Sequence, residues 1–474
     1  MINPAATACL LNIWTLAAPP LTLDDVMSSA LQSLPTVESA RLAIEKARGS
    51  FVSSRGSFDL NLKAEGSADA IGFYDRLDGE VKLEQSTRIW GLELVGGYRN
   101  GSDHPAYDGK RVTSDGGELK AGLLLPLLKG GPIDKARLAE ALARLDINLA
   151  ELELDLVRLQ LLQEAGKAYW NWVSAGLQLQ VVERLLKLAL QRQDFVRAQV
   201  ESGDRPAILL VDNDRVVADR TRERVKARVT LRKAAIKLSI FWRNEQGDPI
   251  IPEPERLPSL PEPVTMTQLD LEQALTAELP RRPDVQQLQV LRTKLRQELR
   301  LATNSILPKL DLEVMASKEL GEKRSYGSPN DFESKNETEI GLGLSFAFPV
   351  QTRAARGKAA SLRASIGSLD QKARFLRDKL RAAVRQAWVD VRASREQAEL
   401  AAETAQLTQT LQEAERERFE LGQSDIFILN LREESAAKAQ SKLVDTTINV
   451  QTARLDFWTA AGVSWERLSA REGN

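Results

Sequence analysis

Two long stretches of the sequence contain no proline. None occurs between Pro132 and Pro206, and none follows Pro349. Because proline inside a helix removes a hydrogen bond and clashes with the preceding turn, only such windows can hold very long helices. A helix of roughly 70 residues is about 100 Å long at 1.5 Å per residue, which is more than one globular core can bury. We therefore expect the long helices to pack on one another lengthwise.

Leucines in the first window follow a 3.5-residue repeat, which is typical of a left-handed coiled-coil seam. The repeat comprises Leu138, Leu142, Leu145, Leu149, Leu152, Leu156 and Leu159. The second window repeats the scheme from Leu362 to Ala387. A second stripe beside it, at a spacing of seven, comprises Val384, Val391, Ala398 and Ala405. Two seams suit a helix with a neighbour on each side, although the helices alone are also compatible with an ordinary antiparallel bundle.

The two halves of the chain resemble each other on either side of a linker that holds six prolines between Pro249 and Pro263. Gly203 and Gly422 lie 219 residues apart, and Tyr169 and Trp388 share that offset. We interpret this as an internal duplication. The predicted segments are an export-signal-like region at 1–24, repeat 1 at 25–245, the linker at 246–265, repeat 2 at 266–462 and a tail at 463–474. Each repeat is predicted to contain one shorter helix followed by two long ones. They lie near 35–54, 133–201 and 207–243 in repeat 1, and near 268–304, 354–420 and 426–461 in repeat 2.

The hydrophobic period changes from 3.6 to 2 between the short and the long helices. Apolar and polar residues alternate in runs that begin near Phe58, Val81, Glu118, Leu310 and Ile340. Runs of about ten residues with one apolar and one polar face are typical of strands that span a membrane around a wet lumen. A soluble amphipathic sheet is the alternative, but the polar helices offer no obvious face to cover so many strands.

The composition argues against most enzymes and against nucleic-acid binding. Lys and Arg number 65 against 66 Asp and Glu, so no bulk charge attracts nucleic acid. A single cysteine, Cys9, and a single histidine, His104, exclude a Cys/His metal site and nearly every histidine-based acid–base mechanism. We expect His104 to lie in an exposed loop and the acidic pair Glu433–Glu434 to lie on a solvated helix face. We expect no catalytic site, cofactor or metal.

Several short motifs, in this order, resemble those of the TolC-like outer-membrane efflux protein family. They are Ala168-Tyr169-Trp170, Arg281-Arg282-Pro283-Asp284, Leu307-Pro308-Lys309-Leu310, and the turns Leu125–Gly131 and Phe348-Pro349-Val350. The resemblance covers about residues 25 to 462. It implies a mainly α protein with a membrane β-barrel, in which each protomer duplicates a helix–strand–long helical hairpin unit. Three protomers would form a twelve-stranded barrel, four strands each, on a coiled-coil α-helical barrel.

A four-stranded open sheet of this kind could not span the membrane alone, because lipid forbids its exposed edges. The trimer that the resemblance implies would close the barrel. The resemblance implies a passive exit duct in outer-membrane lipid, with its helical tunnel in the periplasm. Its partners would be a periplasmic adaptor and the inner-membrane transporter of a tripartite efflux pump or type I secretion system, and its cargo small molecules or proteins. A periplasmic coiled-coil adaptor is the alternative, which would carry one helical hairpin rather than two.

One departure from the family concerns the first strand region. From Asp59 to Pro126 the chain advances 67 residues, but from Asp311 to Pro349 only 38. The surplus of 29 residues contains strand-like runs near 79–86 and 89–99. The sequence leaves open whether strand ends are extended or a surface hairpin is added.

Two kinds of turn are predicted functional regions. The strand-to-helix turns contain Pro126, Gly130, Gly131 and Pro349. The helix-to-helix turns at Gly203 with Asp204, and at Gly422, are the expected periplasmic tip and gate, where glycine permits a left-handed turn.

The expected gate departs from the family prototype, in which the turn carries a Tyr, an Arg and two aspartates. By resemblance, these positions hold Phe419, Ser424, Ile428 and Leu431. We therefore expect a mouth held mainly by apolar packing. Acids elsewhere are expected to contribute, with Asp212, Asp214 and Asp425 as candidates. In the alternative, Asp425 or Asp212 lines the pore and rebuilds an acidic ring.

Overall fold

The computed structural model describes residues 19–69, 71, 76–102, 113–262, 265–321 and 338–472. Cys9, His104 and most of the predicted segment 1–24 lie outside these residues. The chain forms two compact units. The helical unit comprises Met1–Ala40, Leu154–Pro283 and Arg377–Asn474, and the sheet unit comprises Arg41–Glu153 and Asp284–Leu376.

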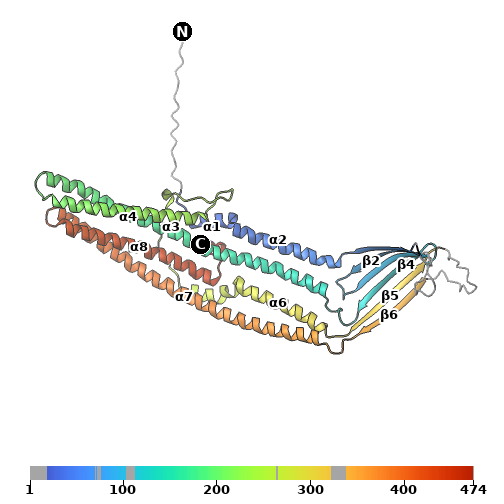
Figure 1. The fold of residues 1–474 in the computed structure, drawn as a ribbon. Coiled ribbons are helices and arrows are strands. Elements are labelled where there is room, and N and C mark those ends of the chain that lie inside the picture. The colour runs from blue at the N-terminus through green and yellow to red at the C-terminus, as the bar shows by residue number, and fades with distance from the viewer. Residues whose placement is uncertain are drawn as a thin grey trace, which may run out of the picture. The chain divides into compact units, whose positions relative to one another are not determined.

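The sheet unit contains one antiparallel sheet whose strands follow one another in chain order (Figure 1). Its strands are β1 (Asn61–Asp69), β2 (Arg76–Ser86), β3 (Glu93–Ser102), β4 (Glu118–Pro126), β5 (Lys309–Glu319) and β6 (Thr338–Ala347). Helices α2 (Pro35–Arg55) and α6 (Pro283–Asn304) lie mostly in this unit. Each strand has 9 to 11 residues, which is the length that crosses a bilayer when tilted.

The sheet has six strands, so the four strands per protomer expected from the resemblance are wrong for this chain. The surplus residues of repeat 1 form β2 and β3, which pair between β1 and β4. They are neither extensions of other strands nor a hairpin outside the sheet. Their apolar and polar residues alternate in phase with the neighbouring strands, and this allows them to join the sheet.

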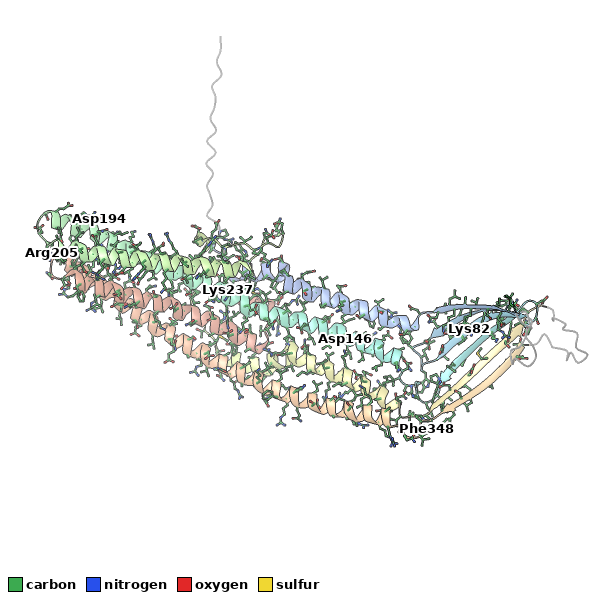
Figure 2. The ribbon with its side chains drawn as sticks, viewed as in Figure 1. Lys82, Asp146, Asp194, Arg205, Lys237 and Phe348 are labelled. Carbon is green, nitrogen blue, oxygen red and sulfur yellow. The ribbon has the colours of Figure 1, made fainter. Side chains whose placement is uncertain are left out.

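The register places apolar side chains on one face of all six strands. Leu62 lies opposite Leu83, and Val81 opposite Tyr98; the pattern continues to Leu342 on β6, whose side chain is 76% exposed. The other face is polar: Lys63 lies opposite Lys82, Glu80 opposite Arg99, and Arg99 opposite Glu118. Figure 2 labels Lys82 on this sheet, and Phe348 just after β6.

The helical unit is built on two helical hairpins. They are formed by α3 (Lys135–Glu201) with α4 (Ile208–Ser239), and by α7 (Arg353–Glu420) with α8 (Ile426–Ala461). The first residues of α3 and α7 belong to the sheet unit. Short helices α1 (Leu23–Ser33), α5 (Gln268–Gln273) and α9 (Trp465–Glu472) complete the unit. Trp172 and Phe457 are fully buried in its core.

The second stripe predicted on the second long helix is buried. Val384, Val391, Ala398 and Ala405 are 0 to 6% exposed along α7. Such a stripe at a spacing of seven packs lengthwise against neighbouring helices. The two longest helices, of 67 and 68 residues, occupy the proline-free windows.

The single helix predicted near 268–304 is wrong. After α5 the chain forms a π-helical turn at Ala274–Glu278 and a 3-10 turn at Leu279–Arg281 before α6 begins. Pro280 and Pro283 each lack a backbone N–H, which ends a regular helix here. The break places Arg282 so that its guanidinium donates to the carbonyls of Thr459 at 2.8 Å and Ala460 at 2.6 Å.

In the part of the chain that the structure describes, no helix is long and apolar enough to cross a membrane.

Candidate functional site

Both helix-to-helix turns have the same backbone geometry. Gly203 and Gly422 are left-handed, with φ of +80° and +73°. At the first turn, the N–H of Asp204 donates to the carbonyl of Gln199 at 2.9 Å, and that of Gly203 to Val200 at 3.1 Å. This bond pair is the Schellman motif that ends a helix. Figure 2 labels Asp194 and Arg205 beside this turn.

The second turn repeats the motif. The N–H of Gln423 donates to Arg418 at 2.8 Å, and that of Gly422 to Phe419 at 3.0 Å. The two turns lie next to each other in Figure 1. Phe195 on α3 and Phe419 on α7 link the hairpins, with ring centroids 6.1 Å apart in an edge-to-face arrangement. An apolar contact thus accompanies the turn at Phe419.

The remaining predicted tip residues fall into two groups. Ile428 and Leu431, in the first turns of α8, are 38% and 53% exposed. Ser424 makes a polar contact that the sequence analysis did not foresee: its hydroxyl lies 2.5 Å from a carboxylate oxygen of Glu415, which is 5% exposed. Arg418 lies 3.6 Å from the same carboxylate. Polar contacts therefore persist at this turn.

Each predicted acid of the tip has a local partner. The Asp425 carboxylate caps α8 by accepting the N–H of Ile428 at 2.9 Å, and Asp212 pairs with Arg215 at 3.2 Å. Asp214 accepts a hydrogen bond from Gln193 at 2.5 Å. Asp204 accepts one from the hydroxyl of Ser202 at 2.9 Å. These contacts explain the acids as a helix cap, an ion-pair partner and acceptors of side-chain hydrogen bonds. A role for Asp212, Asp214 or Asp425 in a pore stays a prediction.

A buried charge cluster joins three helices of the helical unit. One carboxylate oxygen of Glu433 on α8 accepts from Arg192 on α3 at 2.9 Å, and the other from Arg220 on α4 at 3.0 Å. Asn213 accepts from Arg192 at 2.8 Å. All four side chains are at most 6% exposed. The cluster ties the first hairpin to the second.

The expectation that Glu433 lies on a solvated face is therefore wrong. Glu433 is 4% exposed because two arginines from the other hairpin compensate its charge. Burial lowers the pKa of Arg220, while the carboxylate of Glu433 acts in the opposite direction. The neighbouring Glu434 is solvated and pairs with Lys438 at 2.5 Å.

The strand-to-helix turns of the sheet unit are closely packed. Pro126 ends β4, and Gly130 follows with φ of +93°. The N–H of Gly130 donates to Asn304 of α6 at 2.8 Å. At Gly131 a side chain would meet Trp90, because an added Cβ would lie 2.5 Å from the indole nitrogen. These contacts explain the two glycines by close approach and backbone conformation.

The equivalent turn of the second repeat begins at Pro349. Thr352 has φ of +40°, and its N–H donates to the carbonyl of Pro349 at 3.2 Å. The turn leads directly into α7. Among the described residues, no three His, Cys, Asp or Glu side chains gather to hold a metal ion.

Known proteins resemble this chain in structure but not detectably in sequence. No family model and no curated protein matches the sequence. The outer membrane protein VceC of Vibrio cholerae matches the structure with a TM-score of 0.62 at 16% identity, over 94% of this chain and 96% of that one. The chain has the fold of the TolC-like outer-membrane channels.

Further channels agree with this assignment. The outer membrane channel MtrE of Neisseria gonorrhoeae, in its open state, gives a TM-score of 0.63 at 15% identity and covers 93% of this chain and 88% of its own. CmeC of Campylobacter jejuni gives 0.61 at 13% identity, over 100% and 96%. The predicted resemblance is confirmed at the level of the TolC-like fold.

The left-handed turn of the second hairpin can be tested by comparing two Gly→Ala substitutions, for which we expect changes of opposite sign in the free energy of unfolding. Gly422 has open space around its Cα, so Gly422→Ala acts through φ alone and should destabilise the protein by about 1–2 kcal/mol. Gly367, inside α7, also has open space but no positive φ, so Gly367→Ala should stabilise by about 0.5–1 kcal/mol. Denaturant unfolding followed by circular dichroism measures both; equal effects would contradict the assignment of the turn.

The buried cluster gives a second test. Glu433→Leu leaves two buried guanidinium groups without a counter-charge and should lower the free energy of unfolding by about 3–5 kcal/mol. Glu434→Leu is the matched control, because a solvated ion pair contributes at most about 1 kcal/mol. If the two variants unfold at the same denaturant concentration, the cluster does not hold the hairpins together.

Proposed function

We propose that this chain is a passive exit duct in the bacterial outer membrane that works as a homotrimer. It would carry small molecules or proteins outward for a tripartite efflux pump or a type I secretion system. The observation that carries the proposal is the sheet. It has an apolar face on every strand, an opposite polar face, and helical hairpins in the same chain, as TolC-like channels do.

The apolar face of the sheet supports insertion in lipid. Leu62, Leu83, Leu342 and Phe346 are 41 to 76% exposed in the single chain. An exposed apolar surface that runs across six strands needs a nonpolar environment. The opposite face carries charged residues such as Lys63, Glu80 and Lys120, which suit a water-filled lumen.

Exposed stripes on two long helices support association with further copies. The stripe on α4 comprises Val225, Val229 and Ile236, and that on α7 comprises Val389, Leu400, Leu407 and Leu411; all are 49 to 62% exposed. Spacings of 4, 7 and 11 residues place each set on one side of its helix. In a ring of helices each stripe would meet a neighbouring chain.

The helix-to-helix turns are the proposed contact sites for the other components. The turns at Gly203 and Gly422, with their exposed neighbours Leu421 and Phe427, would meet the periplasmic adaptor and the inner-membrane transporter. The Phe195–Phe419 contact and the polar contacts of Glu415 would hold the mouth. The alternative, that the chain is itself an adaptor, is disfavoured because that class carries one helical hairpin and this chain has two.

Membrane insertion can be tested on β6, where neighbouring residues face opposite sides. Leu342→Arg places a charge on the apolar face and should cost about 2–4 kcal/mol near the middle of the membrane. Ser345→Arg places the same charge on the polar face and should leave insertion unchanged. The measurement is the amount of trimer in isolated outer membranes by gel electrophoresis without heating.

Two further outcomes would contradict the proposal. One is a wild-type chain that fractionates away from the outer membrane. The other is a pair of β6 variants that insert equally well. A host that lacks its own exit duct should regain export on expression of the wild-type chain with its matching pump, and should not regain it with Leu342→Arg.

A further inference from the structure

The strands β2 and β3 are integral members of the sheet and do not form a separate hairpin outside it. β1 pairs with β2 along its whole length, and β2 with β3 from Leu77 to Ser86. Most apolar residues of the hairpin oppose apolar or small ones, as in the pairs Ala64–Val81 and Leu83–Gly96, whereas Leu94 and Val95 oppose Gln85 and Glu84. A shift by one residue would move every side chain to the wrong face. The hairpin therefore continues both faces of the sheet.

The turn between β2 and β3 is also held by contacts to the segments where β1 begins and β4 ends. This turn, residues 87–92, is held by Arg88, whose Nε donates to Glu140 of α3 at 2.8 Å. The side-chain amide of Gln85 donates to the carbonyl of Phe58, just before β1. Trp90 packs beside Gly131 of the strand-to-helix turn. No helix follows β2 directly, so these contacts to α3, to the segment before β1 and to the strand-to-helix turn hold the extra hairpin in place.

One chain cannot close this sheet on itself. A barrel of about eight strands has an interior just wide enough to be filled by side chains. Six strands would enclose less space, yet the inner face carries long charged side chains such as Lys63, Lys82, Arg99 and Glu313. The edges β1 and β6 therefore need partners outside the chain.

We propose that the edge of β1 pairs with β6 of a neighbouring copy, so that three copies close an eighteen-stranded barrel. The inference rests on the proposed function and adds to it an expected width for the outlet. Because barrel diameter grows roughly linearly with strand number, the outlet is about one and a half times as wide as that of a twelve-stranded barrel. Each protomer contributes six strands to this barrel, two more than the four per protomer of a twelve-stranded trimer.

The wall of this wide outlet is acidic. Ten acids and five bases lie on the polar face among residues whose side chains are described, a difference of five negative charges per chain. The acids are Glu65, Asp78, Glu80, Glu84, Glu93, Glu118, Asp311, Glu313, Glu319 and Glu339. The bases are Lys63, Lys82, Arg99, Lys120 and Lys309. A lumen lined by one sign of charge concentrates cations, so the outlet suits bulky cargo of positive or neutral charge.

Single cysteines on β2 test whether the hairpin lies in the wall. In the full chain with Cys9→Ser, which removes the one native cysteine, Val81→Cys faces lipid and Lys82→Cys faces the lumen. In outer membranes, a membrane-impermeant maleimide should label Lys82→Cys several-fold faster than Val81→Cys. Labelling after denaturation in detergent should be equal and serves as the control.

Cryo-electron microscopy of the detergent-solubilised full chain then counts the strands. Eighteen strands around one lumen support the proposal. A trimer with twelve wall strands, and with equal maleimide labelling of Val81→Cys and Lys82→Cys in the membrane, overturns it while the proposed exit duct stands. A chain that forms no membrane-inserted trimer overturns both.

Discussion

Unpaired backbone groups at the two edges of the sheet are the constraint on which the rest of the molecule depends. In hydrocarbon every N–H and C=O that finds no partner costs several kcal/mol. Among the strands that the structure describes, β1 and β6 each pair on one side only and so present such a row. The same strands expose an apolar face that water disfavours. An environment of lipid, with further copies at both edges, meets the two requirements together.

The helices also carry apolar surface that requires neighbours, partly within the protomer and partly from further copies. The buried stripe of α7, from Val384 to Ala405, packs within the protomer. The exposed stripes, such as Val225 to Ile236 on α4, remain for neighbours. Within the protomer, the Arg192–Glu433–Arg220 cluster fixes which faces of the hairpins meet. Replacing a buried ion cluster by apolar residues often leaves stability unchanged, so its contribution here is better explained as fixing the register of the two hairpins.

The sequence predicted what depends on local chemistry. Proline-free windows placed the long helices within two residues of their observed starts, and the glycine positions marked both left-handed turns. It failed where partners are remote. Runs near 79–86 and 89–99 were visible as strands, but their place between β1 and β4 depends on register across the sheet. Glu433 read as a surface acid because its arginines are 241 and 213 residues away in the chain.

Native mass spectrometry of the full chain, extracted from membranes in detergent, tests the central claim most directly. The central claim is that this open sheet is completed by identical neighbours. It predicts a complex of three chains, about three times the 52.5 kDa chain less any residues removed on export. A stable particle that contains one chain, with the exposed apolar face still intact, would contradict it.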